Sequence, residues 1–400
     1  MSASRVGPLA ATPLRLFSLA VAGQFLFGIV LALPGTLFGL PRWTASRGFD
    51  VSRQAELLVV FFSGQFLFTA IAGSLVDRFG CQRLLALGAG LIAVAFVWLA
   101  ASASANAAMA SALVMAIGGA TINAASNTLV SATFGQRRGS MLSLMATFGA
   151  LGALGAPVVF LGSSDPPGVA ARLGALALLA TTVAMLPLLV DDTPPARSGM
   201  SFVASLSLLR ERPLVGLIAL LGLEFGDEAI LAGWTAAYAI AVFPGVTGGI
   251  FVGCYWGGLC LGRIAAPALL SRLPKLTLVL AASLTTCAAV ATMALAPTAV
   301  VLGAAVAIAG FAVGPMAPTL VSVAGDRYPR QMGAAIGLVL SIAQLGGMVL
   351  PWLTGKATIA FGYRAGLAVP ALAALSIAVG SALVWHTRAR RPAMAVRSTP

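Results

Sequence analysis

Apolar runs of helical length recur along the whole chain, and only short polar stretches separate them. A helix of about 20 apolar residues is long enough to cross the hydrocarbon core of a bilayer. Twelve such helices are predicted, over about 14–40, 54–76, 82–102, 106–133, 140–162, 170–190, 213–243, 247–270, 275–296, 299–324, 332–355 and 364–386. The pattern therefore predicts an all-α membrane protein with twelve transmembrane helices.

The longest polar interruption runs from Asp191 to Arg212 and holds the sequences Asp-Asp-Thr-Pro-Pro and Arg-Glu-Arg-Pro. It lies after the sixth predicted span, so it divides the chain into two equal sets of helices. We predict an N-terminal six-helix bundle over 1–192, a cytoplasmic linker over 193–211 and a C-terminal six-helix bundle over 212–400.

The two sets of helices also look like repeats. Thr-Leu-Val-Ser at 128–131, near the end of span 4, recurs at 319–322, near the end of span 10. Basic residues follow both copies, and then a glycine-rich helix that contains proline, Pro157 in one case and Pro351 in the other. Because these features agree in span number, we predict a duplicated six-helix unit with pseudo-symmetric halves.

Composition agrees with a membrane protein: 59% of the residues are hydrophobic, 9% are charged, and the mean hydropathy is +0.99. The net charge of +13 comes from basic residues in short loops. If both termini are cytoplasmic, that side holds 18 of the 24 Lys and Arg residues, as the positive-inside rule requires. We therefore expect a multi-pass protein of the plasma membrane (the inner membrane of a bacterium) and no nucleic-acid partner. The outer residues Arg42, Arg47 and Arg53 go against this trend.

The chain shows no pattern that predicts an enzyme. Its four cysteines lack metal-site or disulfide spacing, and its single histidine, His386, lies at the end of the last apolar run. No nucleophile–base pair or metal-ligand set occurs within the spans. We expect no cofactor, no bound metal and a monomer.

The seventh apolar run carries three acids, Glu224, Asp227 and Glu228. At this spacing they share one face of a helix. Each ionised carboxylate at bilayer depth costs about 2.5–3.5 kcal/mol, so three on one stripe are not expected to face lipid. They are expected to line a wet cavity.

The segment from Gly73 to Arg83, Gly-Ser-Leu-Val-Asp-Arg-Phe-Gly-Cys-Gln-Arg, resembles the loop 2–3 signature of the major facilitator superfamily. A degenerate copy, from Gly262-Arg263 to Arg272, lies at the equivalent place after span 8. The resemblance implies a transporter whose halves rock around a central site. It also implies gating residues at the positions that match: Gly73, Asp77, Arg78, Gly80, Arg83 and Arg263.

Within the superfamily, Glu228, Trp234 and Tyr238 resemble a Glu…Gly-Trp…Tyr pattern of the fucose permease group, and Tyr255-Trp256 is similar to the Tyr-Trp of that group's span 8. The resemblance implies a sugar-like or small polar solute moved with protons. Symporters of the group carry acids in spans 1 and 4, where this chain has Gln24 and asparagines. Any proton site must then lie in span 7.

We therefore expect proton coupling at Glu228, Asp227 and Glu224, because burial and mutual repulsion favour proton binding by neighbouring carboxylates. Amides and aromatic rings suit a hydroxylated solute. The expected solute-binding residues are Asn123, Asn127, Trp234, Tyr238, Tyr255, Trp256, Gln344 and Gln24. Three alternatives stay open: sodium as the coupling ion, proton-driven efflux of amphipathic compounds, and a sensor that transports nothing.

Overall fold

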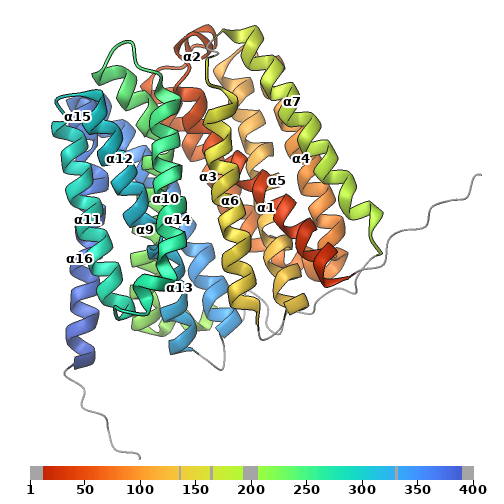
Figure 1. Cartoon of the computed structure of the whole chain (residues 1–400), viewed down its shortest axis with the longest axis vertical. Helices are drawn as coiled ribbons and strands as arrows, with labels where there is room; N and C mark the ends of the chain where they lie inside the picture. The colour runs from red at the N-terminus through yellow and green to blue at the C-terminus, as the bar shows by residue number, and fades with distance from the viewer. Residues whose placement is uncertain (1–11, 135–136, 163–164, 192–205, 329–331, 390–400) are drawn as a thin grey trace, which may run out of the picture.

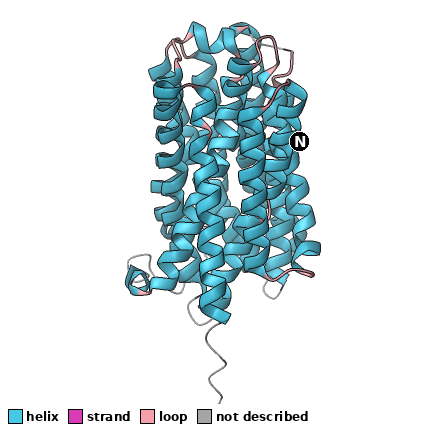
Figure 2. Ribbon diagram, turned by 90° about the vertical axis from the view of Figure 1, so that its left-hand side faces the viewer, coloured by secondary structure: helices cyan, strands magenta, loops and turns pink. Residues whose placement is uncertain are grey.

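The computed structural model describes residues 12–134, 137–162, 165–191, 206–328 and 332–389, and these form helices and loops without a strand (Figure 2). The first half of the chain supplies α1 (Pro13–Phe38), α2 (Pro41–Ser46), α3 (Val51–Phe79), α4 (Cys81–Ala101), α5 (Ala105–Phe134), α6 (Arg138–Val159), α7 (Pro166–Met185) and the 3-10 turn η2 (Leu186–Leu189). Side-chain acceptors cap three of these helices: Thr12 on α1, Asp50 on α3 and Asp165 on α7.

The second half supplies η3 (Leu206–Arg210), α9 (Arg212–Val242), α10 (Gly248–Leu270), α11 (Lys275–Leu295), α12 (Ala299–Val313), α13 (Met316–Arg327), α14 (Met332–Phe361), α15 (Tyr363–Gly366) and α16 (Ala368–Ala389). The tenth predicted span is two helices, because Gly314 and Pro315 interrupt it. The twelfth is α15 followed by α16. The short helix α2 has no counterpart among the predicted spans.

Ten of the described helical segments are long and apolar enough to cross a membrane, and α3 and α9 run beside them to complete a set of twelve. The acids Glu224, Asp227 and Glu228 lower the hydropathy of α9.

Helices from the first half lie on one side of Figure 1 and those from the second half on the other. The boundaries that we predict for the two bundles stay predictions, and residues 193–205 of the linker lie outside the described residues.

The same packing scheme occurs in both halves. In the first, α1 packs on α6, α3 on α5, and α4 on α5 and α7. In the second, the helices at the matching places in the repeat form the same pairs: α9 with α14, α10 with α12, and α11 with α12 and α16. The contacts between the halves are paired in the same way, α3 with α14 and α10 with α6. The fold is therefore two pseudo-symmetric six-helix bundles.

Glycines bring the central helix pairs into backbone contact. A Cβ atom at Gly28 of α1 would overlap the Gly149 carbonyl oxygen of α6. In the second half, a Cβ atom at Gly346 of α14 would overlap the Gly222 carbonyl oxygen of α9. Such small residues let helices approach closely in a membrane, where no hydrophobic force drives helices together.

The halves meet in the part of the molecule nearer to α2, which we call the α2 end. A Cβ atom at Gly35 of α1 would overlap the Ala232 carbonyl oxygen of α9, and one at Gly355 of α14 would lie 2.6 Å from Ala55 of α3. Nearer the middle, Ser63 of α3 donates a hydrogen bond to the Met348 sulfur of α14 at 2.9 Å. We call the opposite end of the molecule the termini end.

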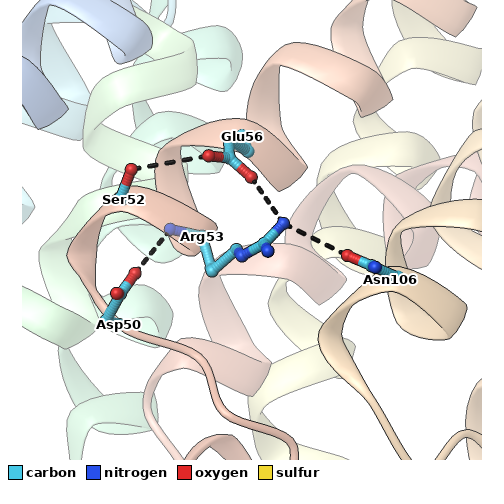
Figure 3. A network of polar contacts seen from close by, with 5 residues as sticks. All are labelled: Asp50, Ser52, Arg53, Glu56 and Asn106. Carbon is cyan, nitrogen blue, oxygen red and sulfur yellow. Dashed lines mark hydrogen bonds and ion pairs between the residues drawn. The ribbon is translucent and has the colours of Figure 1, made fainter.

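Polar contacts at the α2 end account for two of the three basic residues that go against the charge trend, Arg47 and Arg53. Arg53 donates to Glu56 at 3.0 Å and to Asn106 of α5 at 3.1 Å, while Asp50 caps its helix (Figure 3). Arg47 is buried, donates to Ser102 at 3.2 Å and lies 4.4 Å from the centre of the Trp43 ring. These arginines hold the first loop against neighbouring helices.

Candidate functional site

The three acids of span 7 lie in the middle of α9. Glu224 and Asp227 are completely buried, and none of their four carboxylate oxygens has a hydrogen-bond partner among the described residues. A buried polar group without a partner costs free energy, and a buried charge costs more. The two carboxyl groups therefore do not act as hydrogen-bonding links between helices, as structural polar residues in membranes do.

Glu228 differs from its neighbours because it has a cationic partner. Its Oε2 atom lies 3.7 Å from a guanidinium nitrogen of Arg263 on α10. The two side chains are 19% and 24% exposed, whereas Glu224 and Asp227 are fully enclosed. The separation is longer than a hydrogen bond, so this is a loose ion pair.

Tyr255 of α10 completes the group, which we call the acid cluster: Glu224, Asp227, Glu228, Tyr255 and Arg263. The hydroxyl of Tyr255 is buried, has no hydrogen-bond partner among the described residues and interacts electrostatically with the other four side chains. Glu224 likewise interacts with both other acids and with Arg263. One positive charge can offset only one of three carboxylates.

The first half of the molecule supplies uncharged polar groups instead. Gln24 of α1 donates to Asn123 of α5 at 3.3 Å, and Asn127 donates to the same Asn123 side chain at 2.9 Å. The structure adds Gln65 of α3, which is 2% exposed and has no partner for its Nε2 atom among the described residues. Gln65 lies beside Gly119, one helical turn from Asn123.

We call Gln24, Gln65, Asn123 and Asn127 the amide row. Gln65 is not among the solute-binding residues predicted from the sequence, although a single glutamine inside the apolar stretch 57–72 is a signal that could have identified it. Helix α1, which carries Gln24, packs against α5 and also against α9 and α10, the two helices that carry the acid cluster.

The aromatic candidates lie in the interior of the second half, and two of them bond to neighbouring helices. The Trp234 indole donates to the Pro351 carbonyl of α14 at 3.3 Å, and the Tyr238 hydroxyl donates to the Met293 carbonyl of α11 at 2.8 Å. Trp256 is buried beside Tyr255, with ring centres 5.5 Å apart. Gln344 is half-buried on α14. The structure therefore brings Tyr255 to the acid cluster, while Trp234 and Tyr238 link helices.

The expected gating residues are placed in two regions. Gly80 has a φ of 86° and forms the turn between α3 and α4, a conformation that glycine adopts readily. Arg78 and Arg83 are exposed near this turn, whereas the surroundings of Gly73 and the side chain of Asp77 lie outside what the structure describes. Arg263 lies inside α10 and faces Glu228.

Comparison with known proteins identifies the class. The family model of the Major Facilitator Superfamily matches residues 20–351. The chain belongs to that superfamily and is a multi-pass integral membrane protein of a family of small-molecule transporters. None of the curated proteins compared with it matches by sequence.

Solved structures with the same fold include two named transporters. A variant of the nucleoside transporter NupG superposes with a TM-score of 0.76 at 15% identity, covering 93% of this chain and 99% of that one. A variant of the E. coli fucose:proton symporter FucP gives 0.65 at 20% identity, covering 92% and 98%. FucP in its outward conformation gives 0.65 at 19% identity. At these identities the likeness shows the fold.

Proposed function

We propose that this protein moves a small hydroxylated or otherwise polar solute across the membrane together with protons, by alternating access of a central site to the two sides. The observation that carries the proposal is the acid cluster: three carboxyl groups in the middle of α9, two of which have no hydrogen-bond partner in the described part of the chain. Intramembrane acids are expensive and are typically found on ion or proton pathways.

Charge balance supports protons as the coupling ion. Arg263 offsets one carboxylate, so the acid cluster is neutral only when two of its three carboxyl groups carry protons. Glu228 is the acid that water or solute can reach, since it is the only one of the three with an exposed surface. We therefore assign proton exchange to Glu228, with Asp227 and Glu224 as its electrostatic partners.

The amide row supports a hydroxylated solute. Side-chain amides both donate and accept hydrogen bonds, and Gln24 and Gln65 each have one polar atom that no described residue bonds. The two transporters of the same fold named above are a nucleoside transporter and a fucose:proton symporter, whose solutes carry several hydroxyl groups.

The direction of opening follows from the contacts between the halves. The close glycine approaches between α1 and α9, and between α3 and α14, lie at the α2 end or at mid-helix. We infer that the halves are closed at the α2 end and that the site opens toward the termini end. The excess of Lys and Arg there assigns that end to the cytoplasm. Asp77 is expected to act at this end as a gate residue, so that Asp77→Asn alters the transport rate more than the solute affinity.

The test is uptake by purified protein in proteoliposomes, with a panel of labelled sugars, sugar acids and nucleosides and with imposed pH or sodium gradients. We expect accumulation driven by the pH gradient and lost in Glu228→Gln. Glu56→Gln, the same change at an exposed acid of the α2 end, is the control and should accumulate solute normally.

Three outcomes would contradict the proposal. Unchanged accumulation by Glu228→Gln would remove the assigned proton site, and accumulation driven by sodium alone would replace the coupling ion. Export of amphipathic compounds, with no solute taken up, would replace uptake by efflux.

A further inference from the structure

Arg263 holds hydrogen-bonding capacity that the protein does not use. A guanidinium has five N–H donors in a planar arrangement that matches a carboxylate in two parallel bonds. The described residues offer Arg263 the Glu228 carboxylate at 3.7 Å, which is beyond hydrogen-bond distance, and no hydrogen bond to another group. The side chain is 24% exposed, so its donors are open to an entering solute.

The other charged and titratable groups near Arg263 belong to the acid cluster or to α10 itself. They are Glu224, Asp227, Glu228, Tyr255 and Cys260. Helices α12, α6, α1 and α11 also pack against α10. The ranges 299–313 and 140–159 contain no ionisable residue, α1 has Arg15 near its start, and α11 has Lys275 at its start and Cys287. Within the acid cluster the partly exposed charged side chains are Glu228 and Arg263, at 19% and 24%, so a solute that enters the site meets this pair.

We propose that the solute carries a carboxylate, and that this carboxylate replaces Glu228 as the partner of Arg263. The inference rests on the proposed function above and narrows its solute class to a hydroxylated carboxylic acid, such as a sugar acid. The amide row then binds the hydroxyl groups, and Arg263 binds the acid group.

The exchange of partners links solute binding to proton binding. When the solute carboxylate pairs with the guanidinium, the Glu228 carboxylate loses its compensating charge. One proton from the water on the open side adds to Glu228, so the net charge of the acid cluster with its solute does not change. Release of the solute on the other side reverses both steps: the proton leaves Glu228, and the ion pair forms again.

Two other solute types fit the geometry less well. A cationic group would meet the exposed guanidinium and be repelled by it. A neutral sugar would leave the Glu228–Arg263 pair intact. Its binding would not change the charge around Glu228 and would therefore not favour protonation of that side chain. A carboxylate accepts hydrogen bonds from the Arg263 donors that have no partner among the described residues. Its negative charge is balanced by the proton that Glu228 takes up.

The test compares three solutes of one shape: a hexose, the hexuronate with a carboxylate at C6, and the corresponding amino sugar. Their affinities are measured by calorimetry on the purified full-length protein, in buffers of different ionisation enthalpy, so that protons taken up are counted. We expect the hexuronate to bind at least about tenfold tighter than the hexose, with one proton taken up for each molecule bound.

Variants separate binding from folding. Arg263→Lys should keep the preference for the hexuronate with weaker binding, because lysine retains the charge without the planar donors. Arg263→Gln should lose the preference. The double variant Glu228→Gln with Arg263→Gln removes both charges and keeps their balance. It should unfold near the wild-type temperature and bind hexose and hexuronate equally.

Other results would overturn the inference and are distinguishable from failure of the proposed function. If the hexose binds as tightly as the hexuronate and moves with protons, the solute class is wrong while proton coupling stands. Tightest binding of the amino sugar would show that the cluster accepts cations. If no solute of the wider panel moves protons, the proposed function itself fails.

Discussion

In the first half of the molecule, α1 and α6 touch where the backbone of Gly28 meets that of Gly149, and in the second half α9 and α14 touch in the same way at Gly346 and Gly222. The chemistry carried by these similar frameworks differs. The first half presents neutral amides from α1, α3 and α5, and the second presents three acids and an arginine from α9 and α10. The two halves thus share their packing and differ in their central polar groups, so packing and chemistry can be perturbed separately.

The largest losses of stability are expected at the glycine backbone contacts that the two halves have in common. Gly28→Leu and Gly346→Leu each place a side chain inside a neighbouring backbone, which should destabilise the protein by at least about 3 kcal/mol and lower its unfolding temperature in detergent. Gly174→Ala and Gly337→Ala are the controls, since a Cβ atom there meets no other atom within 4 Å. If the leucine variants unfold at the same temperature as the alanine controls, the backbone contacts are not as close as described.

The next largest changes in stability are expected when each half is given a polar group of the kind that the other half carries. Asn123→Asp adds a carboxylate to the amide row and should cost about 2.5–3.5 kcal/mol of stability at neutral pH. Asp227→Asn removes an acid that has no hydrogen-bond partner among the described residues. It should unfold at or above the wild-type temperature, while solute-driven proton movement falls. A loss of stability in Asp227→Asn would indicate a structural role for this acid.

A smaller effect is expected within the amide row. Asn123→Ala removes the acceptor shared by Gln24 and Asn127 and should weaken solute binding by about 1–1.5 kcal/mol, or roughly tenfold. The number of protons moved with each solute should not change, because the acids are on the other half. Asn106→Ala, an amide at the α2 end, is the control; binding measured by calorimetry should be unaffected there.

The smallest effects are expected at the exposed ion pairs. Arg53 pairs with Glu56 at 3.0 Å in the first half, and Lys275 pairs with Asp326 at 2.6 Å in the second. Arg53→Gln and Lys275→Gln should each lower the free energy of unfolding by less than about 1 kcal/mol, and by still less at high salt. Unequal losses would show that one half depends on its surface charges more than the other.

The lengths of the apolar runs were sufficient to predict the twelve spans, since a bilayer requires long apolar helices and leaves few alternatives. Short helix α2 could not be found in this way, because its six residues are fixed by Arg47, Trp43 and the loop after α4. The break between α12 and α13 has a sequence signal in Pro315, because proline interrupts helices. Apolar residues continue on both sides of Pro315, so the run was predicted as one span.

The acids of the candidate site could also be identified from the sequence, because charges in an apolar run are conspicuous. The groups that these acids contact could not be identified from the sequence. Arg263 was expected at a gate, from its place in a degenerate repeat of the loop signature, and the structure places it beside Glu228. The hydrogen bonds of Trp234 and Tyr238 go to backbone carbonyls on α14 and α11, and no spacing within one helix specifies which neighbour will supply such a group.

The anchoring of Arg47 has a consequence for how the protein is made. Its side chain bonds to Ser102, and its carbonyl oxygen accepts from the Ala105 amide at 2.9 Å, so both partners are synthesised more than fifty residues later. Until α4 and α5 have entered the bilayer, the first loop carries three arginines, some of whose final partners are not yet in place. In the orientation that the loop charges predict, α1 and α3 therefore insert against an unfavourable charge distribution, and the later contacts to Ser102 and Ala105 hold the loop in place.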